Sequence, residues 1–271
     1  MWLCTLQRLS RRESFPEATH PAPNAASFAY PEDMETLNQK VCLVTGATRG
    51  IGRAIAKVML EDGASVVICG RSQESVDKTV AELHIETGGK VAGKAADVRN
   101  NADVSELFQF ADAQFGGLDV LVNNAGVGVF RPITELTIQD WQYTIDTNLT
   151  GVFYCCREAL SRFASRGAGY IINISSLAGK NPFAGGAAYN ASKFALNGFS
   201  EAVMLDTRQK NVRVSYIMPG SVATEFGHSP DTGRDWKIWP EDIAEIVRTL
   251  LRMPARTLIS RLEVRPSIPK R

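Results

Sequence analysis

The chain has 271 residues, of which 44% are hydrophobic and 22% charged. These proportions are typical of globular proteins, and they argue against a disordered, collagen-like or disulfide-stapled chain. Thirty basic and twenty-nine acidic residues give a formal net charge of +1, so the composition provides no electrostatic footprint for nucleic acid or an anionic membrane.

Residues 1–35 are rich in proline, serine and alanine and lack helical or strand periodicity. We therefore expect a disordered N-terminal extension over residues 1–35, followed by one domain over residues 36–271. Met34 is a candidate for the natural start of the protein. The sequence contains no run of 18 apolar residues, so no transmembrane helix is expected.

From residue 40 onward, short apolar runs alternate with longer amphipathic stretches. The runs predict buried strands and the stretches predict helices. Strands are expected at 41–45, 65–69, 91–96, 120–122, 170–174, 212–218 and 258–264, and helices at 50–62, 73–87, 101–115, 137–165, 187–209 and 241–253. Several strands are apolar throughout, which indicates helices on both faces. The pattern predicts a three-layer α/β/α, Rossmann-type doubly wound parallel sheet of about seven strands in a single domain.

The cysteines form an odd set without any C-x-x-C spacing: Cys4, Cys42, Cys69, Cys155 and Cys156. Cys42 and Cys69 lie in apolar runs that predict strands, where small buried thiols are common. This usage favours reduced cysteines in a reducing compartment, and we expect a cytoplasmic protein. The three histidines are far apart in the sequence, so no metal site is expected.

The first predicted strand ends in a glycine turn, residues 45–53, with the spacing G-x-x-x-G-x-G. Such a turn lets the backbone approach a phosphate, and the N–H groups and dipole of the following helix favour the anion. The spacing differs from the common G-x-G-x-x-G fingerprint, and no P-loop lysine follows. A purely structural turn is the alternative. The candidate phosphate-binding residues are Gly46, Thr48, Arg49, Gly50, Ile51 and Gly52.

The second predicted strand is followed by Arg71, where NAD-binding folds carry an acidic residue for the ribose 2′-hydroxyl. Arg49 lies inside the glycine turn. Two guanidinium groups near a 2′-phosphate favour NADP(H) over NAD(H) through charge-assisted hydrogen bonds. The alternative is that Arg71 is a solvated loop arginine.

Five motifs follow one another in the chain: Thr45-Gly46-x-x-x-Gly50-x-Gly52, Asn123-Asn124-Ala125-Gly126, Ser176, Tyr189-x-x-x-Lys193 and Pro219-Gly220. In this order and with these elements around them, they closely resemble the short-chain dehydrogenase/reductase family over about residues 38–265. The chain is similar to NADP-dependent members of the 3-oxoacyl-acyl-carrier-protein reductase type. Those relatives end with a glycine-rich Asp-Gly-Gly run, whereas this chain ends in a basic segment that contains prolines. This difference argues against a role in fatty-acid synthesis.

Tyr189 and Lys193 are four residues apart on a predicted helix and therefore share a face. A free phenol has a pKa near 10, which a nearby ammonium would lower. Tyr189 could then act as general acid toward a carbonyl oxygen or as general base toward an alcohol. The resemblance implies that Ser176 orients the substrate oxygen, with Ser175 as its competitor. It also implies that Asn148 supports a proton relay through water to the lysine.

The resemblance implies further cofactor contacts and a substrate pocket. Asp97 and Val98 would contact the adenine. The remaining implied contacts with NADP(H) are Asn124, Ala125, Gly126, Tyr189, Lys193, Pro219, Gly220, Val222 and Thr224, and the pocket candidates are Phe130, Leu177, Phe183, Phe226, Trp236 and Trp239. The predicted helices at 137–165 and 187–209 resemble the dimer faces of the family, so a homodimer or homotetramer is expected.

These observations lead to one expected activity and two alternatives. The expected activity is NADPH-dependent reduction of a ketone, an aldehyde or a 3-oxoacyl-type substrate to an alcohol. The first alternative is NADP-dependent oxidation of a sugar, a steroid or a secondary alcohol. The second is a non-catalytic NADP-binding sensor. The expected partner is a small molecule, with no nucleic acid, membrane or metal involved.

Overall fold

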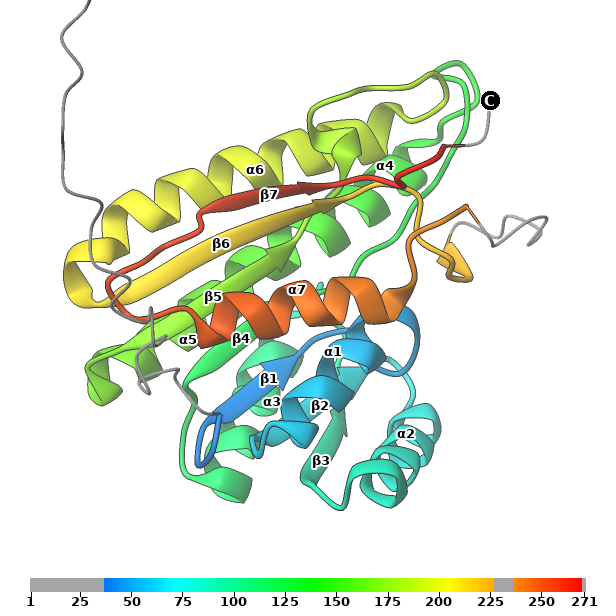
Figure 1. Ribbon diagram of the computed structural model, residues 1–271. Helices are drawn as coiled ribbons and strands as arrows, with labels where there is room; N and C mark the ends of the chain where they lie inside the picture. Colours follow the sequence, from blue (N-terminus) through cyan, green and yellow to red (C-terminus); the bar gives the residue numbers. More distant parts are fainter. Residues whose placement is uncertain (1–36, 227–235, 270–271) are drawn as a thin grey trace, which may run out of the picture. The chain divides into compact units, whose positions relative to one another are not determined.

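The computed structural model describes residues 37–226 and 236–269 of the chain. The expected N-terminal extension and Met34 lie outside the described residues. Seven parallel strands form one sheet in the order β3-β2-β1-β4-β5-β6-β7, as Figure 1 shows. The strands are β1 Val41–Val44, β2 Ser65–Gly70, β3 Lys90–Ala95, β4 Val120–Asn123, β5 Gly169–Ile174, β6 Val212–Pro219 and β7 Arg261–Val264. The chain order reverses between β1 and β4, which are neighbours, and such a switch point opens a crevice at the carboxyl ends of the strands.

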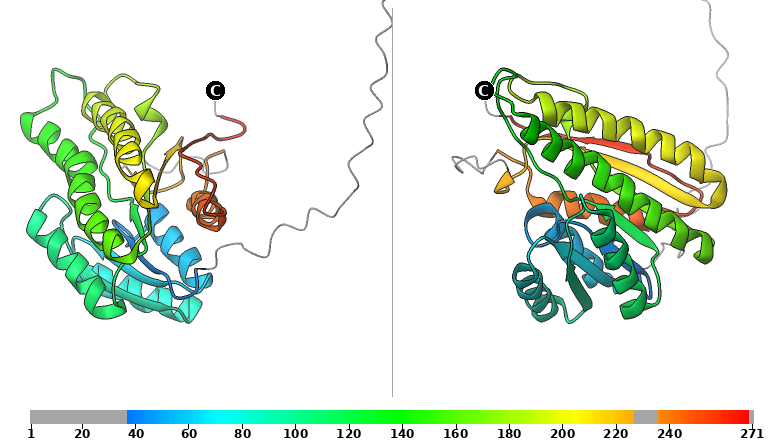
Figure 2. Two further views of the ribbon diagram at one scale, coloured as in Figure 1. Left: turned by 90° about the vertical axis from the view of Figure 1, so that its left-hand side faces the viewer. Right: turned by 180° about the vertical axis from the view of Figure 1, so that it is seen from behind.

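Helices cover both faces of the sheet, so the predicted three-layer, doubly wound fold is confirmed. The α-helices are α1 Gly50–Glu61, α2 Gln73–Thr87, α3 Asn101–Phe115, α4 Ile138–Ile145, α5 Gly151–Arg166, α6 Ala187–Thr207 and α7 Pro240–Arg252. Short 3₁₀ turns occur at Leu177–Gly179 and Arg208–Lys210. Figure 2 shows α3, α5 and α6 on the face seen from behind. Within the described residues, no helix is long and apolar enough to span a bilayer.

Two hydrophobic cores separate the three layers. On β1, Cys42 and Val44 pack into the core shared with α1, α2 and α7. Their neighbours Val41 and Leu43 pack into the core shared with α3, α5 and α6. Successive side chains of a strand point to opposite faces, so an apolar run of four residues contributes to both cores at once. This requirement explains why the strands read as unbroken hydrophobic runs.

The expectation of one uninterrupted α-helix over residues 137–165 is wrong. Between α4 and α5 the chain forms one π-helical turn, Asp146–Thr150, which carries Asn148. The Asn148 amide donates to the Val127 carbonyl at 2.9 Å and accepts from the Val127 N–H at 2.8 Å. Such widened turns occur frequently at functional sites, and here the turn presents Asn148 to the segment that follows β4. The last strand also begins later than expected, at Arg261. Just before it, the Ile259 carbonyl accepts a hydrogen bond from the Ser215 hydroxyl.

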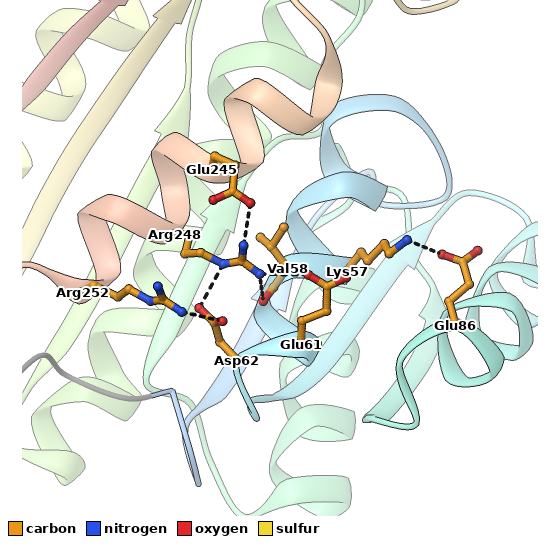
Figure 3. Close-up of polar contacts among 8 residues, drawn as sticks. All are labelled: Lys57, Val58, Glu61, Asp62, Glu86, Glu245, Arg248 and Arg252. Atoms are coloured by element: carbon orange, nitrogen blue, oxygen red, sulfur yellow. Dashed lines mark hydrogen bonds and ion pairs between the residues drawn. The ribbon is translucent and has the colours of Figure 1, made fainter.

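Helices α1 and α7 are joined by an ionic cluster centred on Arg248 (Figure 3). Its guanidinium contacts Glu61 at 2.8 Å, Asp62 at 3.2 Å and Glu245 at 2.5 Å. The Asp62 side chain is only 10% exposed, and Arg252 also pairs with it at 2.8 Å. The cluster therefore holds the C-terminal end of α1 against α7. The N-terminal end of the same helix begins at the glycine turn.

Replacing Arg248 by methionine is expected to lower the free energy of unfolding by about 1–2 kcal/mol, because a mostly buried carboxylate at Asp62 loses one of its two partners. Urea unfolding of the two proteins measures the difference. Arg256→Met, at an exposed position after α7, is the control and is expected to stay within about 0.5 kcal/mol. Equal losses for both variants would contradict the cluster's role.

Candidate active site

The glycine turn after β1 is clamped to the segment that follows β4. Gly46 has a φ of +62°, and a Cβ there would lie 2.8 Å from the Ala125 Cα. The Asn124 Nδ2 donates to the carbonyls of Thr45 at 3.0 Å and Gly46 at 2.9 Å. A Cβ on Gly52 would lie 2.4 Å from that same Nδ2. The turn therefore tolerates no side chain at these two glycines, and its backbone stays open toward the crevice.

Arginines gather at the end of the crevice formed by β2 and β3. Arg71 donates from Nη1 to the Tyr143 hydroxyl at 3.0 Å. The Arg99 guanidinium lies 4.9 Å from the centre of the Tyr143 ring and forms an ion pair with Asp97. At the glycine turn, Arg49 pairs with a glutamate, Glu225, at 2.9 Å. The end of the crevice at β2 and β3 thus combines the guanidinium groups of Arg71 and Arg99 with an aromatic ring, whereas the Arg49 guanidinium is directed to Glu225 in the segment after β6.

Tyr189 and Lys193 share one face of α6, as their spacing predicts, and meet Ser176 at the end of β5. Both side chains are buried, with exposed fractions of 8% and 5%. The Ser176 hydroxyl lies near the Tyr189 phenol and lowers the pKa of that phenol. The Lys193 Nζ lies 5.7 Å from the centre of the Tyr189 ring and donates to the Ile174 carbonyl at 3.0 Å. The three predicted groups are therefore adjacent.

The neighbouring hydroxyl of Ser175 is engaged elsewhere. It donates to the Asn197 Oδ1 at 2.5 Å, and the side chain is buried. Ser176 also accepts a hydrogen bond from the Ala178 N–H at 3.1 Å, which fixes the start of the short helix after β5. Of the two serines that the sequence offers, Ser176 is the one whose hydroxyl faces Tyr189.

Asn148 is fully buried and acts on the site through its neighbours. Besides its bonds to Val127, it donates to the Ser192 hydroxyl at 3.0 Å. A Cβ placed on Gly126 would lie 3.4 Å from the Asn148 Oδ1 and 3.8 Å from the Lys193 Nζ. The missing side chain at Gly126 thus leaves the space between the asparagine and the lysine free, where the predicted relay would run.

A cleft of about 1320 Å³ joins these groups along the carboxyl ends of the strands. Of the residues predicted to bind the cofactor, Gly52 alone does not line the cleft. It lies against the Asn124 side chain and leaves room for the amide that bonds to the glycine turn. The pocket candidate Trp239 also lies outside the lining and is 53% exposed. The predicted residues that do line the cleft are Gly46, Thr48, Arg49, Gly50, Ile51, Arg71, Asp97, Val98, Asn124, Ala125, Gly126, Phe130, Ser176, Leu177, Phe183, Tyr189, Lys193, Pro219, Gly220, Val222, Thr224, Phe226 and Trp236.

A profile of the short chain dehydrogenase family matches residues 40–234. The chain belongs to this family. An NADP-dependent 3-hydroxy acid dehydrogenase of Escherichia coli is 37% identical over 238 residues, covering 83% of this chain and 94% of the relative. An oxidoreductase of Staphylococcus aureus, named as uncharacterized, is 33% identical over 233 residues, covering 86% of this chain and all of the relative.

Two solved structures are similar to this short-chain dehydrogenase. An alcohol dehydrogenase from the archaeon Thermococcus sibiricus, complexed with 5-hydroxy-NADP, superposes with a TM-score of 0.80 at 30% identity and covers 86% of this chain and 98% of its own. A metagenomic short-chain oxidoreductase in complex with NADP has a TM-score of 0.76 at 37% identity, covering 87% of this chain and all of its own. The similarity therefore extends over the sheet and both helical layers.

Burial shifts the pKa values of the two central groups of this short-chain dehydrogenase. Removal from water raises the pKa of Tyr189, and the hydrogen bond from Ser176 partly offsets that rise. Removal from water also lowers the pKa of Lys193 to about 8. At neutral pH Tyr189 is therefore a protonated phenol, which can donate a proton, beside a lysine that is mostly an ammonium.

Two residues of the crevice, Arg99 and Tyr143, were missed by the sequence analysis. Arg99 directly follows Asp97 and Val98, which the family resemblance singled out, so its place in the chain was a signal. Tyr143 lies on α4 and reaches Arg71 only because α4 packs beside the crevice. No local pattern marks it, since its partners are 44 and 72 positions away in the chain.

Proposed function

We propose that this short-chain dehydrogenase is an NADPH-dependent reductase that converts a carbonyl group into an alcohol. The observation that carries the proposal is the buried phenol of Tyr189, which lies next to Lys193 and lines the same cleft as Ser176 and the glycine turn. A protonated phenol in the wall of the cleft can give its proton to a bound carbonyl oxygen. The NADP and NADPH named for similar proteins support the choice of cofactor.

The glycine turn fits the pyrophosphate of a dinucleotide. Helix α1 begins directly after Arg49 without a side-chain cap and without an acidic residue in its first turn. The first N–H groups of the helix and its dipole therefore favour an anion at this end. Arg71 would hold the 2′-phosphate, and the segments after β4 and β6 would hold the nicotinamide half. When bound, NADPH supplies a hydride.

The side chains of the protein supply the proton and the orientation. Ser176 would orient the substrate oxygen through a hydrogen bond, and Tyr189 would protonate that oxygen. The Lys193 ammonium favours the phenolate that remains, and it can return a proton to it through the space that Gly126 leaves beside Asn148. In the opposite direction the same phenolate would accept the proton of an alcohol. This reverse activity is a second candidate, which the name of the 3-hydroxy acid dehydrogenase relative favours.

A cofactor-consumption assay tests the proposal. Purified protein receives NADPH or NADH together with a ketone, an aldehyde, a diketone or a 3-oxoacyl thioester, and in parallel NADP⁺ with secondary alcohols. Carbonyl-dependent loss of NADPH absorbance is the expected result. Formation of NADPH from alcohols alone would establish the reverse activity instead. NADPH binding without turnover in either direction would support the non-catalytic sensor.

Replacing Arg71 by alanine is expected to raise the Kd for NADPH about tenfold and leave the Kd for NADH within about twofold. The physical reason is that a lost charge-assisted bond to the 2′-phosphate costs about 1.4 kcal/mol or more, and NADH has no such phosphate. Fluorescence titration measures both constants. Lys78→Ala, which removes a 77% exposed charge on α2, is the control. An equal rise in the Kd values for NADPH and NADH would show that Arg71 does not bind the 2′-phosphate.

We also propose a homodimer or homotetramer that uses α4, α5 and α6. Large apolar side chains are exposed on these helices, among them Phe153 at 40%, Phe194 at 46% and Leu205 at 62%. Exposed apolar side chains grouped on one surface mark interaction sites. Light scattering on the purified protein is expected to give a multiple of 29.6 kDa. A monomeric mass at micromolar concentration would contradict this assembly.

A reducing compartment such as the cytoplasm suits the cysteines. Cys42, Cys69, Cys155 and Cys156 are free and buried. Burial raises the pKa of the Cys69 thiol to about 11 and that of Cys156 to about 12. These thiols therefore stay protonated and act as small apolar side chains.

A further inference from the structure

Two phenylalanines, Phe130 and Phe226, contact the ring of Tyr189, and a third, Phe183, contacts Phe130; we call these three residues the ring cluster. The centre of the Phe130 ring lies 5.5 Å from that of Tyr189, with its edge toward the phenol, and the Phe226 ring lies 5.7 Å away. Phe130 also contacts Phe183 at 5.7 Å and Phe226 at 6.4 Å. The oxygen that Tyr189 protonates would therefore belong to a group lying among aromatic rings.

The ring cluster is assembled by three different loops, those after β4, β5 and β6. Glycines make room for the rings: a Cβ on Gly128 would lie 2.6 Å from Phe130 and 2.7 Å from Phe226, and one on Gly186 would lie 2.6 Å from Phe183. The rings thus lie directly against the backbone. Their exposed fractions are 42%, 46% and 41%, so each offers a face to a ligand in the cleft.

Four basic side chains near the ring cluster are paired with carboxylates in the part of the chain that the structure describes. Arg131, next to Phe130, pairs with Asp140 at 3.6 Å. Lys180 and Arg265 share Glu263, and Arg49 pairs with Glu225, the neighbour of Phe226. Within residues 37–226 and 236–269, the charge of these four side chains is therefore compensated, and a substrate carboxylate beside them would lose its water without gaining one of these cations as a partner.

We propose that the ring cluster selects uncharged aryl ketones and disfavours 3-oxo acids, an inference that rests on the reductase activity proposed above. The aryl group would pack against the exposed faces of the phenylalanines while the carbonyl reaches Tyr189 and Ser176. The ketone gains two electrons and two hydrogens: the hydride reaches the carbonyl carbon as NADPH becomes NADP⁺, and the proton reaches the oxygen from the Tyr189 hydroxyl. The Lys193 ammonium then returns a proton to Tyr189 and is itself reprotonated by solvent. The product is a secondary aryl alcohol. The preference differs from the acid named for the 37% identical relative.

The test compares substrates that differ in one property at a time. Propiophenone against butanone measures the aryl group, and ethyl 3-oxobutanoate against 3-oxobutanoate measures the carboxylate charge. We expect kcat/KM to be about 10²-fold higher for propiophenone than for butanone, and at least about tenfold higher for the ester than for the acid. A preference for 3-oxobutanoate with NADPH still consumed would overturn the ring-cluster inference and leave the reductase proposal standing.

Variants connect the preference to the rings. Phe226→Ala is expected to lower kcat/KM for propiophenone about tenfold or more, mainly through KM, while butanone changes less than threefold. Phe226→Leu keeps an apolar side chain and replaces the alanine variant if that variant does not fold. Its kcat/KM for propiophenone is expected to lie between those of the unmodified protein and of Phe226→Ala. Ile85→Ala, at an 83% exposed position on α2, is the control. Equal losses for both ketones would show that the ring is only structural.

A binding measurement tests the ring cluster separately from the reductase proposal. If no carbonyl compound is reduced, the reductase proposal fails. The ring cluster is then judged by calorimetric titration of propiophenone into the protein saturated with NADP⁺. Binding that weakens in Phe226→Ala would support the cluster as an aryl site, and absence of binding would overturn it.

Discussion

Replacing Tyr189 by phenylalanine is expected to lower kcat for carbonyl reduction about 10³-fold and to leave the Kd for NADPH within about threefold. The substitution removes only the hydroxyl that would protonate the substrate oxygen. The ring keeps its contacts with Phe130 and Phe226, so the cleft retains its shape. Single-turnover kinetics with saturating NADPH measure the chemical step, and fluorescence titration measures the binding of the cofactor.

The chain offers a matched control for this variant. Tyr154 lies on α5, where its ring contacts Phe153, and Tyr154→Phe removes a hydroxyl away from the cleft. We expect its kcat to match that of the unmodified protein. If Tyr189→Phe retained more than about a tenth of the unmodified kcat, another group would have to supply the proton, and the assigned role would be wrong.

The parts of the fold that the sequence predicted are those with strong local signals. The first strand needs four apolar residues because its two faces contribute to two cores. The glycine turn is equally local, since Gly46 has a positive φ and faces a backbone at 2.8 Å. Tyr189 and Lys193 share a helix face by spacing alone. Each of these features depends on residues close together in the chain.

The features that escaped prediction depend on contacts between distant segments. The π-helical turn at Asn148 follows from hydrogen bonds to Val127, 21 positions earlier. Tyr143 meets Arg71 across 72 positions. The Arg248 cluster spans 186 positions to Asp62. Single phenylalanines could be proposed for the pocket, but their meeting at one tyrosine requires three loops to be placed by the sheet. Tertiary packing fixes such contacts, and no local periodicity encodes them.

Replacing Lys193 by methionine is expected to abolish turnover and yet stabilise the protein at pH 7 by about 2 kcal/mol. Burial lowers the pKa of this lysine from 10.5 to about 8, and a shift of that size corresponds to a cost of about 3 kcal/mol for holding the ammonium in the folded state. Methionine has a similar length and no charge. It forfeits the bond from Nζ to the Ile174 carbonyl, which is worth about 1 kcal/mol. A buried ammonium thus reduces the stability of the fold.

The pH dependence of the stability difference shows whether the buried ammonium is its cause. Between about pH 8 and pH 10.5 the unfolded chain binds a proton at Lys193 that the folded chain does not, so the stability contributed by this group rises with pH in that window. The cost is fully present below about pH 8 and is relieved near pH 10.5, where Lys193→Met should lose its advantage. Urea unfolding at pH 7 and pH 10 measures the change, with Lys78→Met as the exposed control. A variant less stable than the unmodified protein at both pH values would show that packing and the Ile174 bond outweigh the cost of the buried charge.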